Sequence, residues 1–243
     1  MRMFAFAKRT GKEILRDPLN LAFGLGFPGV LILLLSAIQA NIPVSLFEID
    51  RLVPGMTVFG LSFMTLFSAS LIAKDKESAF LTRLYATPMQ AADFILGYTF
   101  PLIPIAMAQN IFCYAIGILL GMEFSVNLIY GVFLSIPIAL FFISLGLLFG
   151  SVLNQKQVGG ICGALLTNLT AWFSGIWFDL ALVGGVFQKI ANALPFSHGV
   201  QLAQAIFAGA FQEALPHLLW VCGYGVLSII TAVLLFLWQM KKG

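Results

Sequence analysis

Residues 52–73 read LVPGMTVFGLSFMTLFSASLIA, and residues 74–88 read KDKESAFLTRLYATP. The first stretch has no charged residue and is as long as the roughly 20 apolar residues that cross a bilayer as a helix. The second stretch brings several charges and ends in a proline, which fits helix starts but not helix interiors. This order predicts a membrane-spanning helix followed by a charged segment at the membrane surface.

The composition indicates that the same alternation runs through the whole chain. Of 243 residues, 60% are hydrophobic and 9% are charged, whereas a soluble domain has about 25% charged residues. A surface covered mostly by lipid explains so low a fraction. We therefore expect a single transmembrane domain over residues 1–243. The net charge of +3 gives no argument for a nucleic-acid partner.

Seven uncharged stretches are long enough to span a bilayer, but one of them, 190–212, is rich in polar residues. Unpartnered polar groups are costly in lipid, so this stretch is interpreted as non-spanning. Together with 180–188 it predicts a pair of re-entrant helices within 179–215, on the extracellular side. The predicted fold class is an all-α integral membrane protein with six transmembrane helices. They lie near 21–39, 52–73, 94–120, 127–150, 158–178 and 217–238.

The distribution of basic residues tests this number of spans. With six spans, eleven of the thirteen lysines and arginines fall on the side that holds both termini. Only Arg51 and Lys189 fall on the other side, whereas the acidic residues divide equally. Because lysine and arginine set membrane topology, both termini are expected in the cytoplasm of a multi-pass plasma (inner) membrane protein.

Residues 1–18 have the period of an amphipathic helix that ends at Pro18. Phe4, Ala7, Gly11, Ile14 and Leu15 share one arc of it. We expect this helix to lie at the membrane interface, either as a simple anchor or with its basic face toward anionic lipid or an acidic partner. The basic face includes Lys8, Lys12 and Arg16.

Residues 74–90 predict a cytoplasmic segment made of a short helix, a break, and the start of the third span. Thr87, Pro88 and Gln90 resemble a helix start, with Thr87 as the cap and Gln90 completing a capping box. The apolar side chains of the short helix need a cover. Lipid or the N-terminal helix can provide it, and the sharper hypothesis is a docking site for another protein.

Two spans carry features of a weakly polar, aromatic path for an amphiphile. Phe59, Phe63 and Phe67 recur at helical spacing in the second span, which is also rich in serine and threonine. Thr167, Asn168 and Trp172 fall in the fifth span. The competing interpretation is that the hydroxyl groups bond to their own helices. Asn168 is the strongest single candidate, because an amide in lipid needs a partner.

The sequence does not contain the residue patterns that nucleotide binding, ion-coupled transport or metal binding require. The GxxxxGK[ST] loop that binds nucleotide phosphates does not occur in the sequence. None of the six predicted spans contains the charged residue that ion-coupled carriers need. The two histidines are too few for a metal site, and His198 is expected to form hydrogen bonds at a helix end. We therefore predict no enzymatic activity and no cofactor bound by this chain. Three GxxxG pairs, starting at Gly117, Gly146 and Gly159, are interpreted as helix-packing sites.

Taken in order, these features resemble the type-2 permease family of ATP-binding-cassette (ABC) exporters. The similarity covers nearly the whole chain: a basic helix ending at Arg16-Asp17-Pro18, re-entrant helices, and Leu194-Pro195-Phe196-Ser197-His198, which is similar to the family's L-P-x-x-H element. The most specific match is to the family's E-x-G-T-L-E-R-L-x-x-T-P signature, although Ser78-Ala79-Phe80 stands in place of Gly-Thr-Leu. It is carried by Glu77, Phe80, Leu81, Arg83, Leu84, Thr87 and Pro88.

The resemblance implies an assembly of two permease chains, identical or different, above two ABC ATPase subunits that bind ATP and Mg. Residues 77–88 are then the coupling helix, Pro195 and His198 belong to the re-entrant element, and spans one, two and five line the pathway. The expected cargo is a hydrophobic or amphipathic small molecule, drug or peptide, as in multidrug resistance. Polysaccharide or lipid-linked export, a secondary carrier, and an immunity or scaffold protein without transport are the alternatives.

Overall fold

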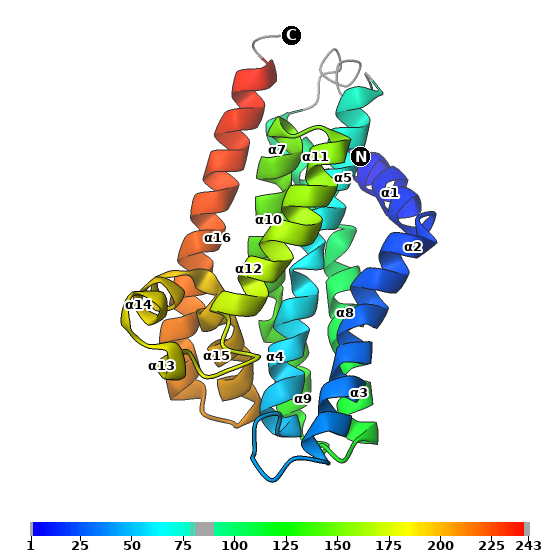
Figure 1. Ribbon diagram of the computed structural model, residues 1–243. Coiled ribbons are helices and arrows are strands. Elements are labelled where there is room, and N and C mark those ends of the chain that lie inside the picture. The colour runs from blue at the N-terminus through cyan, green and yellow to red at the C-terminus, as the bar shows by residue number, and fades with distance from the viewer. Residues whose placement is uncertain (1, 79, 81–89, 241–243) are drawn as a thin grey trace.

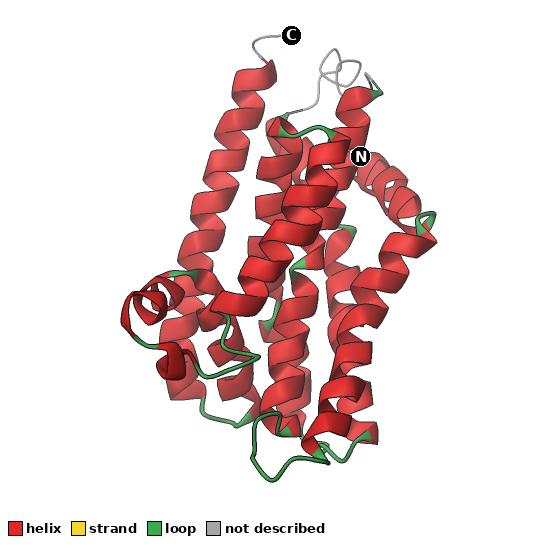
Figure 2. Cartoon of the chain, viewed as in Figure 1, coloured by secondary structure: helices red, strands yellow, loops and turns green. Residues whose placement is uncertain are grey.

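The computed structural model describes residues 2–78, 80 and 90–240, and every regular element in these ranges is a helix (Figures 1 and 2). The N-terminal part contains α1 (Arg2–Leu15), α2 (Pro18–Leu21), the π-helix η1 (Ala22–Gly26), α3 (Phe27–Gln39), α4 (Ile49–Leu61) and α5 (Phe63–Glu77). The middle part contains α7 (Ala91–Thr99), α8 (Leu102–Leu119), α9 (Val126–Leu134) and α10 (Ile136–Val152). The remaining elements are α11 (Gln155–Val158), the π-helix η2 (Gly159–Leu165), α12 (Leu166–Phe173), α13 (Leu180–Val183), α14 (Gly185–Ala193), α15 (Pro195–Phe207) and α16 (Phe211–Met240).

Five helical runs in the described ranges are long and apolar enough to cross a membrane, which confirms the all-α class with several apolar spans. They are Ala22–Gln39, Ile49–Glu77, Ala91–Leu119, Val126–Val152 and Phe211–Trp238. The predicted fifth span corresponds to the run formed by α11, η2 and α12, which is not among the five. Gln155, Lys156, Gln157 and Asn168 make this run less apolar than the others.

Three predicted helix boundaries were wrong for local reasons. The fifth span ends at Phe173 rather than 178, because Gly175 takes a positive φ of 78° that an α-helix cannot contain. The last helix begins at Phe211 and runs through Pro216, so residues 211–215 do not belong to the predicted hairpin. The third span begins at Ala91 with Gln90 as its own N-cap, paired with Asp93 in a capping box. Gln90 has the extended backbone of an N-cap, and the cap predicted at Thr87 lies outside the described residues.

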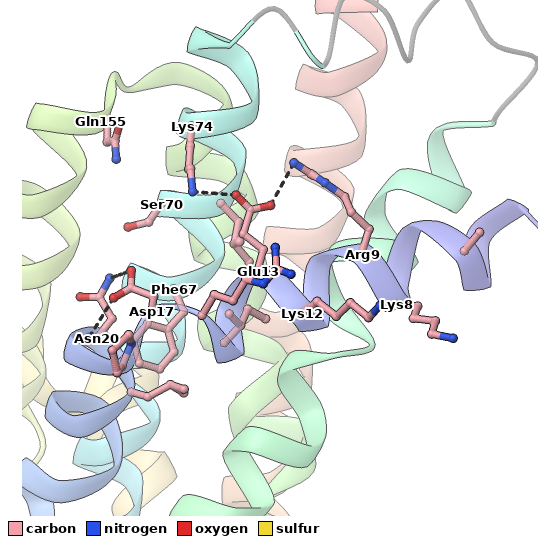
Figure 3. A pocket seen from close by; sticks show the side chains of 16 residues that line it. Lys8, Arg9, Lys12, Glu13, Asp17, Asn20, Phe67, Ser70, Lys74 and Gln155 are labelled. Atoms are coloured by element: carbon pink, nitrogen blue, oxygen red, sulfur yellow. Dashed lines mark hydrogen bonds and ion pairs between the residues drawn. The ribbon is translucent and has the colours of Figure 1, made fainter.

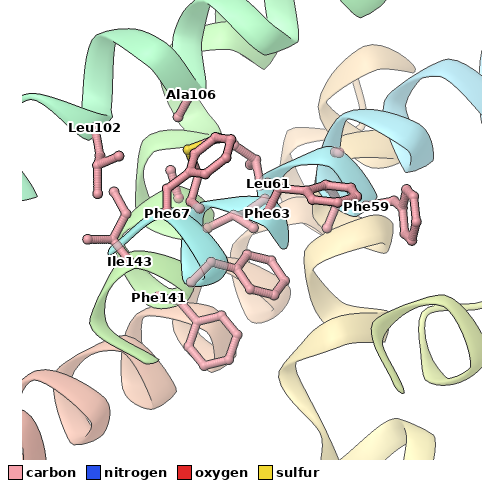
Figure 4. Packing of buried hydrophobic residues seen from close by; sticks show 14 of the residues in the cluster. Phe59, Leu61, Phe63, Phe67, Leu102, Ala106, Phe141 and Ile143 are labelled. Atoms are coloured by element: carbon pink, nitrogen blue, oxygen red, sulfur yellow. The ribbon is translucent and has the colours of Figure 1, made fainter. Parts of the chain in front are cut away.

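The run formed by α4 and α5 is the centre of the bundle. In its most apolar window 89% of the residues are buried, against 22–50% in the other four candidate spans. Its apolar side chains pack against α8 and α10, and Figure 4 shows Leu61, Phe67, Leu102 and Ile143 in this contact. The helix α10 lies between α5 on one side and α16 on the other.

Glycines allow α10 to approach α5 closely. A Cβ added at Gly146 would overlap Ser68 Oγ and lie 2.5 Å from the carbonyl oxygen of Thr65. A Cβ at Gly150 would lie 2.8 Å from the carbonyl oxygen of Ala69. The packing role predicted for this GxxxG pair is confirmed, whereas Gly159 has no atom near its missing Cβ.

The helix α1 lies obliquely on the side of the bundle, near the end where α16 finishes, and leads through α2 into α3 (Figure 1). Ala7 and Ile14 of its predicted apolar arc are buried, but Phe4 and Leu15 are 63% and 68% exposed. Phe6, which was not assigned to that arc, is buried instead. Its ring fits against Gly97 of α7, where any Cβ would collide with it. Contact with α7 therefore shifts the buried arc of α1 away from the one that periodicity predicts.

The contact between α5 and α10 predicts that a single methyl group at Gly146 lowers stability. Overpacking of a close contact costs about 2 kcal/mol, so Gly146→Ala should lower the midpoint of thermal unfolding of the detergent-purified chain. Gly223→Ala is the matched control, because Gly223 lies within α16 with no atom within 4 Å of its missing Cβ. An equal loss of stability in both variants would contradict the packing role of Gly146.

Candidate functional site

A cavity of about 670 Å³ opens between the first candidate span, the central helix run and α12. The residues named for the path lie on its wall except Phe67, which lines a second cavity. Phe59 and Phe63 come from α4 and α5, and Thr167, Asn168 and Trp172 come from α12. The structure thus brings together two segments about 100 residues apart in the chain. The other lining residues are Phe23, Phe27, Leu31, Gly163, Ala164, Ala171, Trp177 and Phe178.

The wall of this cavity is aromatic and carries no Asp, Glu, Lys or Arg among its described lining residues. The ring centroid of Phe27 lies 6.3 Å from that of Phe59 and 6.1 Å from that of Phe63. Phe59 in turn meets Trp177 edge to face at 6.2 Å. Such a surface suits apolar and aromatic groups, which bind through burial and ring contacts rather than through charge.

Three polar side chains break the aromatic wall. The Thr167 hydroxyl donates to the carbonyl oxygen of Gly163, and Asn168 Nδ2 donates to that of Ala164 at 2.8 Å. The amide of Asn168 thereby keeps its Oδ1 as an acceptor at the cavity. Trp177 Nε1 is buried and has no hydrogen-bond partner among the described residues. Within an otherwise apolar lining, the amide of Asn168 is therefore the polar group available at the cavity.

The hydroxyl groups of the second span point elsewhere, which corrects the prediction that they line the path. Thr57 and Ser62 donate to carbonyl oxygens of their own helix at 2.6 Å. Thr65 and Ser68 donate to the carbonyl oxygens of Phe142 and Ile143 in α10. Bonding to the same helix is therefore observed for Thr57 and Ser62. Thr65 and Ser68 instead hold α5 against α10.

Two walls of the cavity contain π-helical backbone. Phe23 belongs to η1, and Gly163 and Ala164 belong to η2. Short π-helical segments inside α-helices are often found at functional sites. Their presence on two facing walls distinguishes this cavity from the packed core around α10.

The coupling segment is described only at its beginning. Glu77, the last residue of α5, accepts a hydrogen bond of 2.8 Å from the backbone N–H of Gln155. Phe80 stacks on Phe6 with ring centroids 6.5 Å apart, and the Arg9 guanidinium lies 4.0 Å from the centre of its ring. The predicted cover by the N-terminal helix is thus observed for Phe80. The other predicted docking residues, Leu81, Arg83, Leu84, Thr87 and Pro88, lie outside the described residues.

A buried ion pair connects this region to α1. Arg9 donates two hydrogen bonds of 2.6 Å to the carboxylate of Asp75, which is 1% exposed. The Tyr98 hydroxyl donates to the same carboxylate at 2.8 Å. The hydrogen bonds from Arg9 to Asp75 raise the pKa of the guanidinium, and Glu13 adds to this effect, so Arg9 stays charged. Three helices (α1, α5 and α7) therefore meet at one carboxylate.

The predicted interface cations are all on the surface. Lys8, Lys12 and Arg16 are exposed and line a second cavity between α1 and α5. None of the three has an ion pair with a described carboxylate. They are therefore free to meet a group from outside the chain.

The predicted re-entrant element forms the start of α15. Pro195 is buried at its first turn, and His198 Nε2 lies 2.9 Å from the carbonyl oxygen of Asn192 near the end of α14. The prediction that His198 bonds at a helix end is confirmed. Its Nδ1 lies 2.8 Å from Nδ1 of His217, and its ring stacks on Trp220 at 4.9 Å. Because Nε2 faces an acceptor, a neutral His198 carries its proton there and accepts through Nδ1.

Sequence reasoning missed the polar pair Gln109 and Asn110, which are 0% exposed in the middle of α8. Gln109 Nε2 donates to the thiol sulfur of Cys113, and Asn110 Nδ2 donates to Ser135 Oγ. The signal was present as two adjacent amides within an apolar span. Their contacts serve helix packing, since neither residue lines either large cavity.

The ion pair at Asp75 predicts a measurable loss of stability on neutralisation. Asp75→Asn removes the buried carboxylate partner of the partly exposed Arg9, which then keeps only its ion pair with Glu13. We expect a loss of about 2 kcal/mol, below the 3–5 kcal/mol typical of a fully buried pair. The control Asp17→Asn changes an exposed carboxylate bonded to Asn20. Equal thermal unfolding midpoints for both variants in detergent would show that Asp75 does not hold α1 in place.

Comparison with known sequences agrees with this arrangement of apolar helices. The sequence family described as "ABC-2 type transporter" matches residues 1–208. No curated protein matches the chain. The matched region includes α1, the cavity with its aromatic wall, the predicted coupling segment, and Pro195 and His198 of the predicted re-entrant element. Since the match covers most of its length, the chain belongs to the ABC-2 type transporter family, as a multi-pass membrane permease subunit.

Proposed function

We propose that this permease exports a hydrophobic or amphipathic small molecule, drug or peptide by ATP-driven alternating access. The observation that carries the proposal is the uncharged aromatic cavity, which is lined by the first, second and fifth predicted spans. These are the spans that the family resemblance assigns to the pathway. Binding there would be driven by apolar burial, with Asn168 selecting for polar groups.

The proposed topology has six crossings and both termini in the cytoplasm. The run α11–η2–α12 would be the additional crossing, since its 19 residues span about 28 Å, close to the thickness of the hydrocarbon core. Figure 1 supports an even number, because α1 and the last turns of α16 lie at the same end of the bundle. The 13-residue α15 is about 20 Å long, too short to cross, which favours a re-entrant hairpin.

Permeases of this family generally work with an ABC ATPase, which would bind the ATP and Mg. We propose that two ATPase subunits dock on residues 77–88 of two permease chains. The family match over residues 1–208 supports this proposal. Phe80, which α1 covers through Arg9 and Phe6, connects the start of the segment to α1. Movement of the docked segment would then shift the path between inward-facing and outward-facing states.

A second permease chain has apolar surface available to it. In the most apolar part of the first candidate span only 28% of the residues are buried, and in that of the last candidate span only 22% are buried. Lipid can cover part of this surface, and a second copy or a related chain can cover the rest. The cavity opens beside the first span, which supports a path between two chains.

The decisive experiment is reconstitution of the permease with its ATPase in inverted vesicles. ATP-dependent uptake of an apolar dye or peptide, absent without ATPase, would support the proposal. Transport driven by an ion gradient without ATPase would favour a secondary carrier, and binding without flux would favour an immunity or scaffold protein. Aromatic walls also stack on sugar rings, so uptake of a polysaccharide or lipid-linked sugar alone would favour that variant.

Substitution of Asn168 should alter substrate selection. Asn168→Leu removes the Oδ1 acceptor from the cavity wall, and the loss of one hydrogen bond is expected to weaken transport of acceptor-dependent substrates about five- to tenfold. ATPase association should not change. Thr231→Val is the control, because Thr231 is an exposed residue that bonds to its own helix far from the cavity. An unchanged substrate profile for Asn168→Leu would assign the residue to packing.

Neutral substitutions in the coupling segment should uncouple the ATPase. Glu77→Gln and Arg83→Gln each remove a charge from the proposed docking surface, and we expect affinity for the ATPase to fall about tenfold, as for one lost charge-assisted contact. Co-purification and substrate-stimulated ATP hydrolysis measure this effect. Glu213→Gln, at the first turn of α16, is the control. Full association and transport in both coupling variants would exclude the docking role.

A further inference from the structure

A second cavity, of about 810 Å³, lies between α1, α2, α5 and the start of α11 (Figure 3). We call it the basic cleft. Its wall on α5 consists of Phe67, Ser70, Leu71 and Lys74, which share one helix face. Its other lining residues are Ala5, Lys8, Arg9, Lys12, Glu13, Ile14, Arg16, Asp17, Pro18, Asn20, Leu21 and Gln155.

The charges in the basic cleft do not balance. Five lysines and arginines line it against two carboxylates, Glu13 and Asp17. Glu13 is already engaged by Arg9 at 2.9 Å and by Lys74 at 2.8 Å, and Asp17 accepts a hydrogen bond of 2.7 Å from Asn20. Figure 3 shows these contacts as dashed lines. The positive charge of Lys8, Lys12 and Arg16 is therefore left without a carboxylate partner among the described residues.

The position of the cleft along α5 corresponds to the headgroup region of a membrane. Lys74 lies three residues before the end of α5 at Glu77, and Phe67 lies ten residues before it. At 1.5 Å per residue the cleft extends from about 5 Å to about 15 Å below that end. The whole run Ile49–Glu77 has 29 residues, or about 43 Å, which equals the thickness of a bilayer with its headgroups. The cleft thus covers the zone where headgroups give way to acyl chains.

The two walls of the cleft, on α1 and on α5, differ in polarity. Lys8, Lys12 and Arg16 provide cationic donors on α1 and its C-terminal end, and Asn20 and Gln155 add polar groups. Phe67 and Leu71 provide an apolar wall on α5, with Ile14 and Leu21 beside them. A soluble acidic protein docked on residues 77–88 would meet the end of α5, not a wall about 15 Å deeper.

We propose that the basic cleft binds the phosphate-bearing headgroup of an anionic membrane lipid. The phosphate lies among Lys8, Lys12 and Arg16, and an acyl chain runs along Phe67 and Leu71. This site rests on the proposed topology, which places it in the cytoplasmic leaflet, where anionic lipids attract basic residues. The bound lipid would hold α1 against α5, beside the coupling segment.

The test is native mass spectrometry of the purified permease alone, titrated with dioleoyl phosphatidylglycerol or dioleoyl phosphatidylcholine. We expect at least tenfold tighter binding of phosphatidylglycerol. The variant Lys8→Gln/Lys12→Gln/Arg16→Gln should abolish this preference, since each basic residue contributes about fivefold. The control Arg51→Gln/Lys156→Gln/Lys189→Gln removes the same charge at exposed residues that do not line the cleft, and should keep the preference.

Several outcomes would overturn the proposal. Equal binding of both lipids would do so, and so would loss of the preference in the control variant. Competition by glycerol 3-phosphate at concentrations as low as those of the lipid would identify a free-phosphate site instead. If the triple variant does not fold, the single variant Lys12→Gln must still weaken phosphatidylglycerol binding about fivefold. Loss of ATPase binding in the triple variant with lipid binding intact would assign the cleft to the ATPase. The lipid titration itself needs neither ATPase nor transport. Its result can therefore be interpreted even if the export proposal fails.

Discussion

The close contact between α5 and α10 is the interaction on which the rest of the structure depends. Lipid gives no hydrophobic force between helices, so packing and hydrogen bonds must hold them together. Here Gly146 and Gly150 let the backbones approach, and the hydroxyls of Thr65 and Ser68 bond to carbonyl oxygens of α10. The run α4–α5 is thereby enclosed by protein. One of its faces is free for the aromatic cavity, and its last turns collect the charges of α1.

Most of the fold could be predicted because hydropathy and charge report directly on the membrane. Uncharged stretches gave the five apolar helical runs, and the polar content of 190–212 separated the short α15 from them. The errors were at helix ends, where single residues decide. Gly175 with its positive φ, Pro216 within a helix, and Gln90 as an unexpected N-cap all depend on local geometry that hydropathy does not record.

The candidate site was predictable only in part. Helical spacing placed Phe59 and Phe63 on one face, and the polar residues of the fifth span identified Thr167 and Asn168, which the structure brings together. The hydroxyls of the second span were misjudged, because periodicity cannot distinguish a helix neighbour from a cavity. The cluster of Arg9, Asp75 and Tyr98 joins residues from three helices. A pairing across 66 residues leaves no trace in one sequence, so only the folded chain shows it.

The π-helical segments η1 and η2 form part of two walls of the aromatic cavity. A π-turn holds more residues than an α-turn while keeping its backbone hydrogen-bonded. Passing one residue of this slack along the helix rotates the neighbouring segment by about 100°, without unwinding the helix or exposing backbone groups to lipid. Phe23 on η1, and Thr167 just beyond η2, would then turn into or out of the cavity. The side chains that line this cavity therefore depend on the helical register of η1 and η2 as well as on the packing of the bundle around α5.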